Sequence, residues 1–105
     1  MSLVKFPEFH PDQGVTRRVL AETDQLMVVS FRFNAGARGK LHSHPHVQST
    51  YVASGSFEFF RGGDAFNLKA GDSLVIPGGV EHGCLCLEKG ELIDNFTPRR
   101  DDFLL

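Results

Sequence analysis

Short segments in which apolar and polar residues alternate recur along most of the chain. Residues 27–33, "MVVSFRF", place Met27, Val29, Phe31 and Phe33 on one face of an extended strand. Similar segments follow at 48–53, 56–60, 65–69, 73–77, 82–87 and 91–97. A two-residue period is typical of half-buried strands, and no segment carries a convincing helical period. The pattern therefore predicts an all-β fold.

Turn-forming residues separate these segments. Ser54-Gly55 lies between the segments 48–53 and 56–60, and "RGGD" lies between 56–60 and 65–69. Glycine favours tight turns because it adopts positive φ without steric cost. We therefore expect these three segments to form a meander. The tripeptide "EKG" predicts a further turn between 82–87 and 91–97.

Composition is consistent with one small globular domain. A chain of 105 residues has room for one core, so we expect a single domain over 1–105. Eleven glycines, ten phenylalanines and no tryptophan suit a turn-rich β protein. The formal net charge of -2, without a long run of either sign, argues against a nucleic-acid partner. No segment resembles a signal peptide or a membrane span of about 20 apolar residues, so we expect a cytoplasmic protein without a membrane partner.

The histidines are concentrated in one stretch. Three of the five in the chain lie in "HSHPH" at 42–46. His42 and His44 are two residues apart, so on an extended segment both rings project from one face and can bind one metal ion. Gln48 follows at the start of the next strand, and His82 opens a later one after the turn "PGGVE". The alternative is that the clustered histidines are solvated loop residues.

The other histidines and the cysteines are weaker candidates. Pro45 interrupts regular alternation, which leaves open whether His46 points inward, and His10 is interpreted as a loop residue. Cys84 and Cys86 are two residues apart on a strand, a separation near or beyond the disulfide limit. We interpret both as reduced packing residues, with a thiolate metal site as the alternative.

The spacing of these residues resembles the cupin motifs. The first cupin motif contains two histidines one residue apart, an acidic or amide residue four positions later and a glycine seven beyond, as at His42, His44, Gln48 and Gly55. The second is matched by Gly71, Pro77, Gly79 and His82. Two positions depart from the pattern, since Gly39 lies closer to His42 than usual and Cys86 replaces a common asparagine. The resemblance implies a double-stranded β-helix (jelly-roll) barrel with one divalent metal ion on His42, His44, Gln48 and His82.

Within the cupins, nearly the whole chain is similar to the small KdgF-type pectin-degradation proteins. The specific parts are the "HSHPH" run, Gln48 and the ending "FTPRRDDF", while Val47 departs from an acidic residue familiar there. Asp94 and Phe96 share one face of their strand. The resemblance implies that Asp94, Phe96 and Arg100 contribute to the active site. Arginine suits a uronate carboxylate because its planar fork binds both oxygens. The alternative is a surface aspartate, a core phenylalanine and a solvated basic turn.

A glutamine ligand has a chemical consequence. Because Gln48 is neutral, a divalent metal keeps its full charge within its protein ligands, which favours Lewis-acid chemistry over oxidation. In the alternative interpretation, Gln48 only forms a hydrogen bond at the barrel rim.

The resemblance implies a small-molecule reaction. KdgF-type proteins open the ring of 4,5-unsaturated uronate monosaccharides from pectin or alginate to the linear 4-deoxy-5-keto uronate. The metal, whether Zn, Ni, Fe or Mn, would polarise substrate oxygens, Asp94 would transfer a proton, and Arg100 would bind the carboxylate. Two alternatives are a non-catalytic cupin that binds a sugar acid and a small Fe(II) cupin dioxygenase.

The apolar ending predicts an assembly. Ten phenylalanines and the sequence "DDFLL" exceed what one small barrel is expected to bury, so we expect residues 103–105 to pack on a neighbour in a homodimer.

Overall fold

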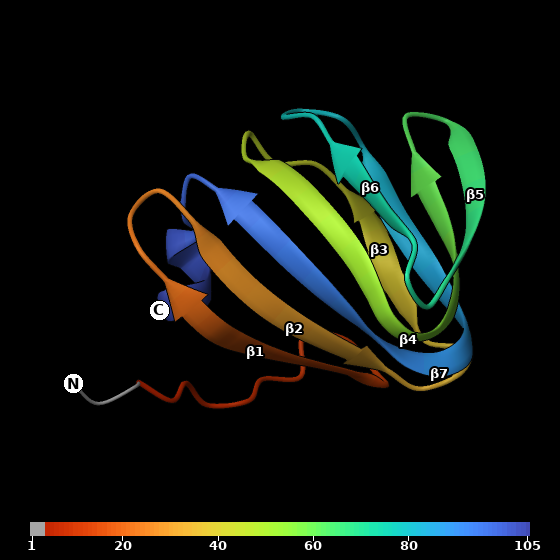
Figure 1. Cartoon of the computed structure of the whole chain (residues 1–105), viewed down its shortest axis with the longest axis horizontal. Helices are drawn as coiled ribbons and strands as arrows, with labels where there is room; N and C mark the ends of the chain where they lie inside the picture. Colours follow the sequence, from red (N-terminus) through yellow and green to blue (C-terminus); the bar gives the residue numbers. More distant parts are fainter. Residues whose placement is uncertain (1–3) are drawn as a thin grey trace.

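The computed structural model describes residues 4–105, which form a seven-stranded antiparallel sheet closed into a barrel (Figure 1). The strands are β1 (Val15–Glu22), β2 (Met27–Phe33), β3 (Arg38–His42), β4 (Val47–Arg61), β5 (Asp64–Lys69), β6 (Ser73–Ile76) and β7 (His82–Thr97). One 3-10 helix, η1 (Asp101–Leu104), follows them. The predicted all-β double-stranded β-helix is confirmed. No helix within 4–105 has the length and apolar character needed to cross a membrane.

Two long strands hold the barrel together. β4 and β7 pair with each other along most of their length, in the order β1-β2-β7-β4-β5. The first part of β7 also pairs with β3, and its second part pairs with β2. Likewise, the first part of β4 pairs with β6 and its last part with β5. Each long strand therefore contributes to both walls of the barrel.

Two predicted turns are wrong. Ser54-Gly55 and "EKG" lie inside continuous strands, at shifts in the register between β4 and β7. Gly55 has φ +76, and a Cβ atom at Gly55 or Gly90 would collide with the backbone of the opposite strand. These glycines permit a bulged bend where two backbones approach closely, so they do not end a strand. Consequently, 48–53 and 56–60 are one strand, and only the hairpin through "RGGD" remains of the meander.

The apolar interior consists of two clusters. The larger contains nine buried residues, including Phe33, Phe57 and Phe59, and the smaller contains Val19, Met27, Val29, Phe96 and Phe103. Cys84 and Cys86 are free and buried in the larger cluster, as predicted for packing residues.

The C-terminal segment packs on its own barrel. Phe103 is buried against Phe31 and Phe96, with edge-on ring contacts at centroid distances of 6.2 and 5.6 Å. The expectation that this side chain packs on a neighbour is therefore wrong, because η1 folds back over the barrel end (Figure 1). Leu105 remains 97% exposed, and the homodimer stays a prediction.

Candidate metal centre and adjoining cavity

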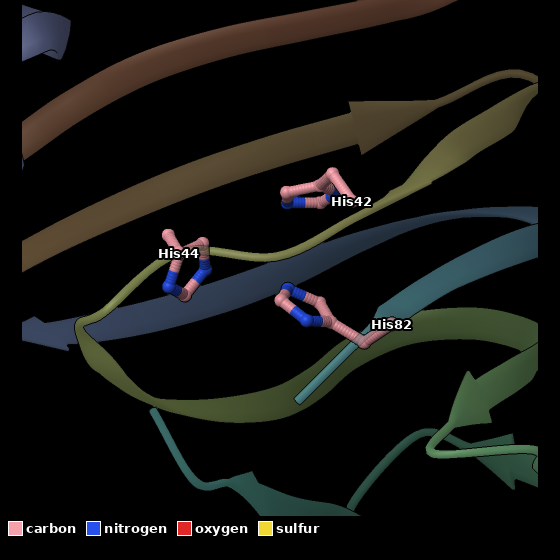
Figure 2. A group of neighbouring side chains, drawn as sticks. All are labelled: His42, His44 and His82. Carbon is pink, nitrogen blue, oxygen red and sulfur yellow. The ribbon is translucent and has the colours of Figure 1, made fainter. Parts of the chain in front are cut away.

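Strand pairing brings the distant histidines together. His42 ends β3 and His82 begins β7, and the two residues are direct partners in the β3–β7 ladder. His44 lies in the connection from β3 to β4. One ligand nitrogen from each of the three rings lies within 4.8 Å of the others, and Figure 2 shows the rings gathered around a common space. This separation allows one metal ion to bind all three.

Backbone carbonyls fix the orientation of each ring. The Nδ1 atoms of His42, His44 and His82 lie 2.7, 3.0 and 2.9 Å from the carbonyl oxygens of Lys40, His46 and Val80. A carbonyl oxygen can only accept, so each Nδ1 carries the proton in the neutral ring. Each Nε2 therefore presents a lone pair, which is the arrangement that metal-binding histidines require.

One of these lone pairs has no partner in the protein. Nε2 of His82 is buried and forms no hydrogen bond with residues 4–105. An unsatisfied buried polar group costs about 1–3 kcal/mol. Burial also lowers the pKa of His82 to about 4, and burial lowers the pKa of His44. Both rings are thus neutral at pH 7 and able to donate a lone pair, so the donor set fits a divalent cation.

Gln48 is oriented by a chain of buried hydrogen bonds. Its Nε2 donates to Oγ1 of Thr50 at 3.0 Å, and the Thr50 hydroxyl donates to Oδ1 of Asp94 at 2.8 Å. This direction of donation turns Oε1 of Gln48 toward His44, 2.9 Å from Nε2. Because Nδ1 of His44 holds the proton, two acceptor atoms face each other there. A cation bound to both would replace this repulsion with attraction, so the pair also fits a metal site.

The adjoining cavity has a volume of about 250 Å³. The predicted residues His42, Gln48, His82, Asp94, Phe96 and Arg100 all line it. Asp94 and Phe96 point inward from β7, where they are register partners of Thr50 and Gln48 on β4. His44 packs beside the cavity with its ring centroid 5.6 Å from that of Phe96. The cavity thus combines histidines, an acid and an arginine.

Asp94 is the most strongly perturbed acid of this cavity. Its side chain is buried, and this desolvation raises the pKa to about 7, against the opposing effect of hydrogen bonds from Thr50 and Gln48 and the charge of Arg100. A carboxyl group with this pKa can both release and accept a proton near neutral pH.

Arg100 has an intramolecular partner that the sequence analysis did not identify. Its Nε and Nη2 bind Asp102 at 3.0 and 2.9 Å, and its guanidinium carbon lies 5.2 Å from the Phe96 ring centroid. Asp102 thus occupies the edge between Nε and Nη2, the edge between Nη1 and Nη2 lies outside this ion pair, and Arg100 lines the cavity. The alternative of a solvated basic turn is wrong for Arg100, whose side chain is 13% exposed.

Other candidates lie outside the histidine cluster. His46 and the two cysteines do not join the three clustered rings, and burial raises the pKa of the Cys84 thiol to about 12. His10 is an exposed residue near Thr16. The sequence analysis also missed Thr50, whose position two residues after Gln48 on the same strand face was the available signal.

Comparison with known proteins identifies the family of this chain. The family profile described as a cupin domain matches residues 29–93. The pectin degradation protein KdgF of Dickeya dadantii is 43% identical over 93 residues, covering 87% of this chain and 84% of that protein. The solved structure of KdgF from Halomonas sp. matches with a TM-score of 0.88 at 38% identity and covers 92% of both chains. An RmlC-like cupin from Shewanella frigidimarina matches with a TM-score of 0.89 at 39% identity, over 93% of this chain and 88% of that chain. With its fold, motifs and sequence relatives in agreement, this chain belongs to the cupin family.

Proposed function

We propose that this chain is a metal-dependent enzyme of pectin or alginate breakdown that converts 4,5-unsaturated uronate monosaccharides into linear 4-deoxy-5-keto uronates. The observation that carries the proposal is the 43% identity with a pectin degradation protein over most of the chain. The cavity supports it, since three histidines with fixed Nε2 lone pairs lie beside a buried acid of pKa about 7.

His42, His44, Gln48 and His82 would hold one divalent ion, with Zn, Ni, Fe and Mn as candidates. When bound, the ion supplies Lewis-acid polarisation of substrate oxygens. As ligands the four side chains are neutral, so they do not offset the positive charge of the metal ion. This donor set favours a redox-neutral reaction.

Asp94 would move the single proton that the reaction requires. Its carboxylate accepts the proton of the anomeric hydroxyl, the bond between C1 and the ring oxygen breaks, and C1 becomes an aldehyde. The electron pair of that bond stays on the former ring oxygen as an enolate at C5. Asp94 then returns the proton to C4, and C5 becomes a ketone. No water or oxidant is consumed, so the conversion is an isomerisation.

The remaining residues would hold the sugar in place. The free edge of the Arg100 guanidinium binds the substrate carboxylate, and Asp102 keeps that edge turned toward the cavity. Phe96 forms an apolar wall beside His44 and Arg100. Together they position C1 and C4 beside Asp94 and reduce the access of water.

The test follows the ultraviolet absorbance of the enol ether in an unsaturated monouronate, with and without protein, against its spontaneous rate. We expect metal-loaded protein to accelerate the loss of absorbance equally in air and under argon. A requirement for oxygen would identify a dioxygenase instead. Tight binding without any acceleration would identify a non-catalytic sugar-acid-binding cupin.

A further inference from the structure

A second arginine occupies an inward-facing position of the barrel. On β1, Val15 and Val19 are buried at 3% and 5% exposure, and Arg17 lies between them on the same strand face. In an alternating strand this position normally carries an apolar residue. Arg17 lines the 250 Å³ cavity, whereas the side chain of its neighbour Arg18 is on the exposed face.

The guanidinium of Arg17 has aromatic contacts but forms no direct ion pair with an acidic side chain of residues 4–105. Its carbon lies 4.1 Å from the ring centroid of Phe103 and 5.6 Å from that of Phe9. Nε is buried without a hydrogen bond, and within residues 4–105 Arg17 forms no ion pair. Burial lowers its pKa from the ordinary arginine value, the negative charge of nearby Asp102 opposes this shift, and the charge of Arg100 adds to it. Stacking stabilises the cation by about 0.5–2 kcal/mol, but it leaves the buried Nε–H donor unsatisfied.

Arg17 and Arg100 meet at the same aromatic ring. The guanidinium carbon of Arg100 lies 4.2 Å from the Phe103 centroid, so the two guanidinium carbons are at most about 8 Å apart, the sum of the two distances. Both guanidinium groups line the same cavity, so they place two positive charges at one end of it. A carboxylate that forms a bidentate pair with one arginine there also lies in the field of the other. Asp102 occupies one edge of Arg100 and forms no ion pair with Arg17.

We propose that Arg17 is the second arm of the carboxylate-binding site and, with Arg100, selects an anionic sugar over a neutral one. This inference rests on the proposed function for the identity of the sugar acid. The two arginines and Phe103 form the end of the cavity that binds the anionic group of the substrate. The histidine end instead binds a cation. A purely structural arginine would need only its stem and its stacking contact, and binding would not depend on its charge.

The test compares Arg17→Met, Arg17→Lys and the matched exposed control Arg18→Met. Methionine keeps an apolar stem, and lysine keeps the charge without the planar fork. Calorimetry on metal-loaded protein measures the Kd of D-galacturonate, a saturated uronate, and of D-galactose, its neutral counterpart. Turnover of an unsaturated uronate gives KM and kcat, while elemental analysis and thermal unfolding check metal content and folding.

We expect Arg17→Met to raise the Kd of galacturonate and the KM by about 10- to 100-fold with a smaller change in kcat. Arg17→Lys should fall between Met and the parent, and Arg18→Met should match the parent. The metal content should stay unchanged. If Arg17→Met does not fold, the lysine variant decides the question, because it retains the charge that lies against Phe103.

The outcomes separate the two proposals. Parent-like KM and Kd in both Arg17 variants overturn the inference. Binding of galacturonate that depends on Arg17, in a parent protein without turnover, supports the inference and overturns the proposed function. A parent protein that neither binds galacturonate nor turns over the unsaturated uronate overturns both.

Discussion

Removing the Thr50 hydroxyl tests whether the buried hydrogen-bond chain positions Gln48. Thr50 is fully buried at 0% exposure and is the link between the Gln48 amide and Asp94. Thr50→Val keeps the shape of the side chain but removes an acceptor from Gln48 and a donor from Asp94. The amide is then free to rotate, so its oxygen no longer faces His44.

Two magnitudes follow from these contacts. Without the hydroxyl, Oδ1 of Asp94 loses its donor and one polar end of the Gln48 amide faces a methyl group in either orientation. A buried polar group without a partner costs about 1–3 kcal/mol, so metal-free Thr50→Val should be less stable by about that amount. For a chain of this size, the thermal midpoint should fall by about 4 °C or more. Loss of a side chain that orients a metal ligand typically weakens metal affinity by about 10- to 100-fold. Thr50→Ser keeps the hydroxyl and should retain most of the affinity.

The assay combines urea unfolding of chelator-treated protein with competition against a chromophoric chelator. The decisive quantity is the difference in metal affinity between Thr50→Val and Thr50→Ser, because both variants alter packing and only one removes the hydroxyl. Equal, parent-like affinities in the two variants would refute the argument that Thr50 orients Gln48.

Four further predictions follow from the site and the chain ending. The parent should hold about one divalent ion per chain by elemental analysis, and His42→Ala and His82→Ala should each lose most of it. Full occupancy in both variants would show that the metal binds elsewhere. Because burial lowers the pKa of His82 to about 4, the metal-free folded state takes up a proton there less readily than the unfolded state. Stability to urea should therefore fall as pH drops from about 6.5 toward 4, and His82→Ala should flatten that slope. Asp94→Asn should retain metal and substrate affinity while kcat falls by about 10²- to 10⁴-fold, and parent-like turnover would return Asp94 to a structural role. Light scattering at micromolar concentration should give the mass of a homodimer, since Leu105 remains exposed, and a monomeric mass would contradict this.

The alternation of apolar and polar residues predicted which segments are extended. It did not predict where each strand ends. The segment 27–33 coincides with β2, and the hairpin through "RGGD" joins β4 to β5. The predicted breaks at Gly55 and Gly90 are wrong because a glycine has the same local signature in a turn and in a bulged bend. Only the pairing of β4 with β7 distinguishes the two, and that contact is not local in sequence.

The sequence predicted those site residues whose spacing along the chain indicates which face of a strand they occupy. The separations of His42, His44 and Gln48 are local, and the structure brings these side chains together with His82. Asp102 and Arg17 were missed for different reasons. Asp102 acts through η1, which has no strand pattern, and Arg17 was hidden in the run "VTRRV", where two adjacent arginines have opposite orientations. Strand alternation applied to that run, with Val15 and Val19 inward, identifies Arg17 as the inward one.

Two buried side-chain atoms of the residues that line the cavity lack a hydrogen-bond partner, and the two atoms require partners of opposite kinds. Nε2 of His82 carries a lone pair and needs a cation or a proton donor, whereas Nε–H of Arg17 needs an acceptor. Both residues line the same cavity, so no single simple ion can satisfy both. A metal ion answers the first demand, and an anionic group within reach of Arg17 and Arg100 answers the second. A sugar acid carries hydroxyl and ring oxygens for the metal end and a carboxylate for the arginine end. The polarity of this cavity therefore supports the proposed substrate, a sugar acid with a charged group at one end only.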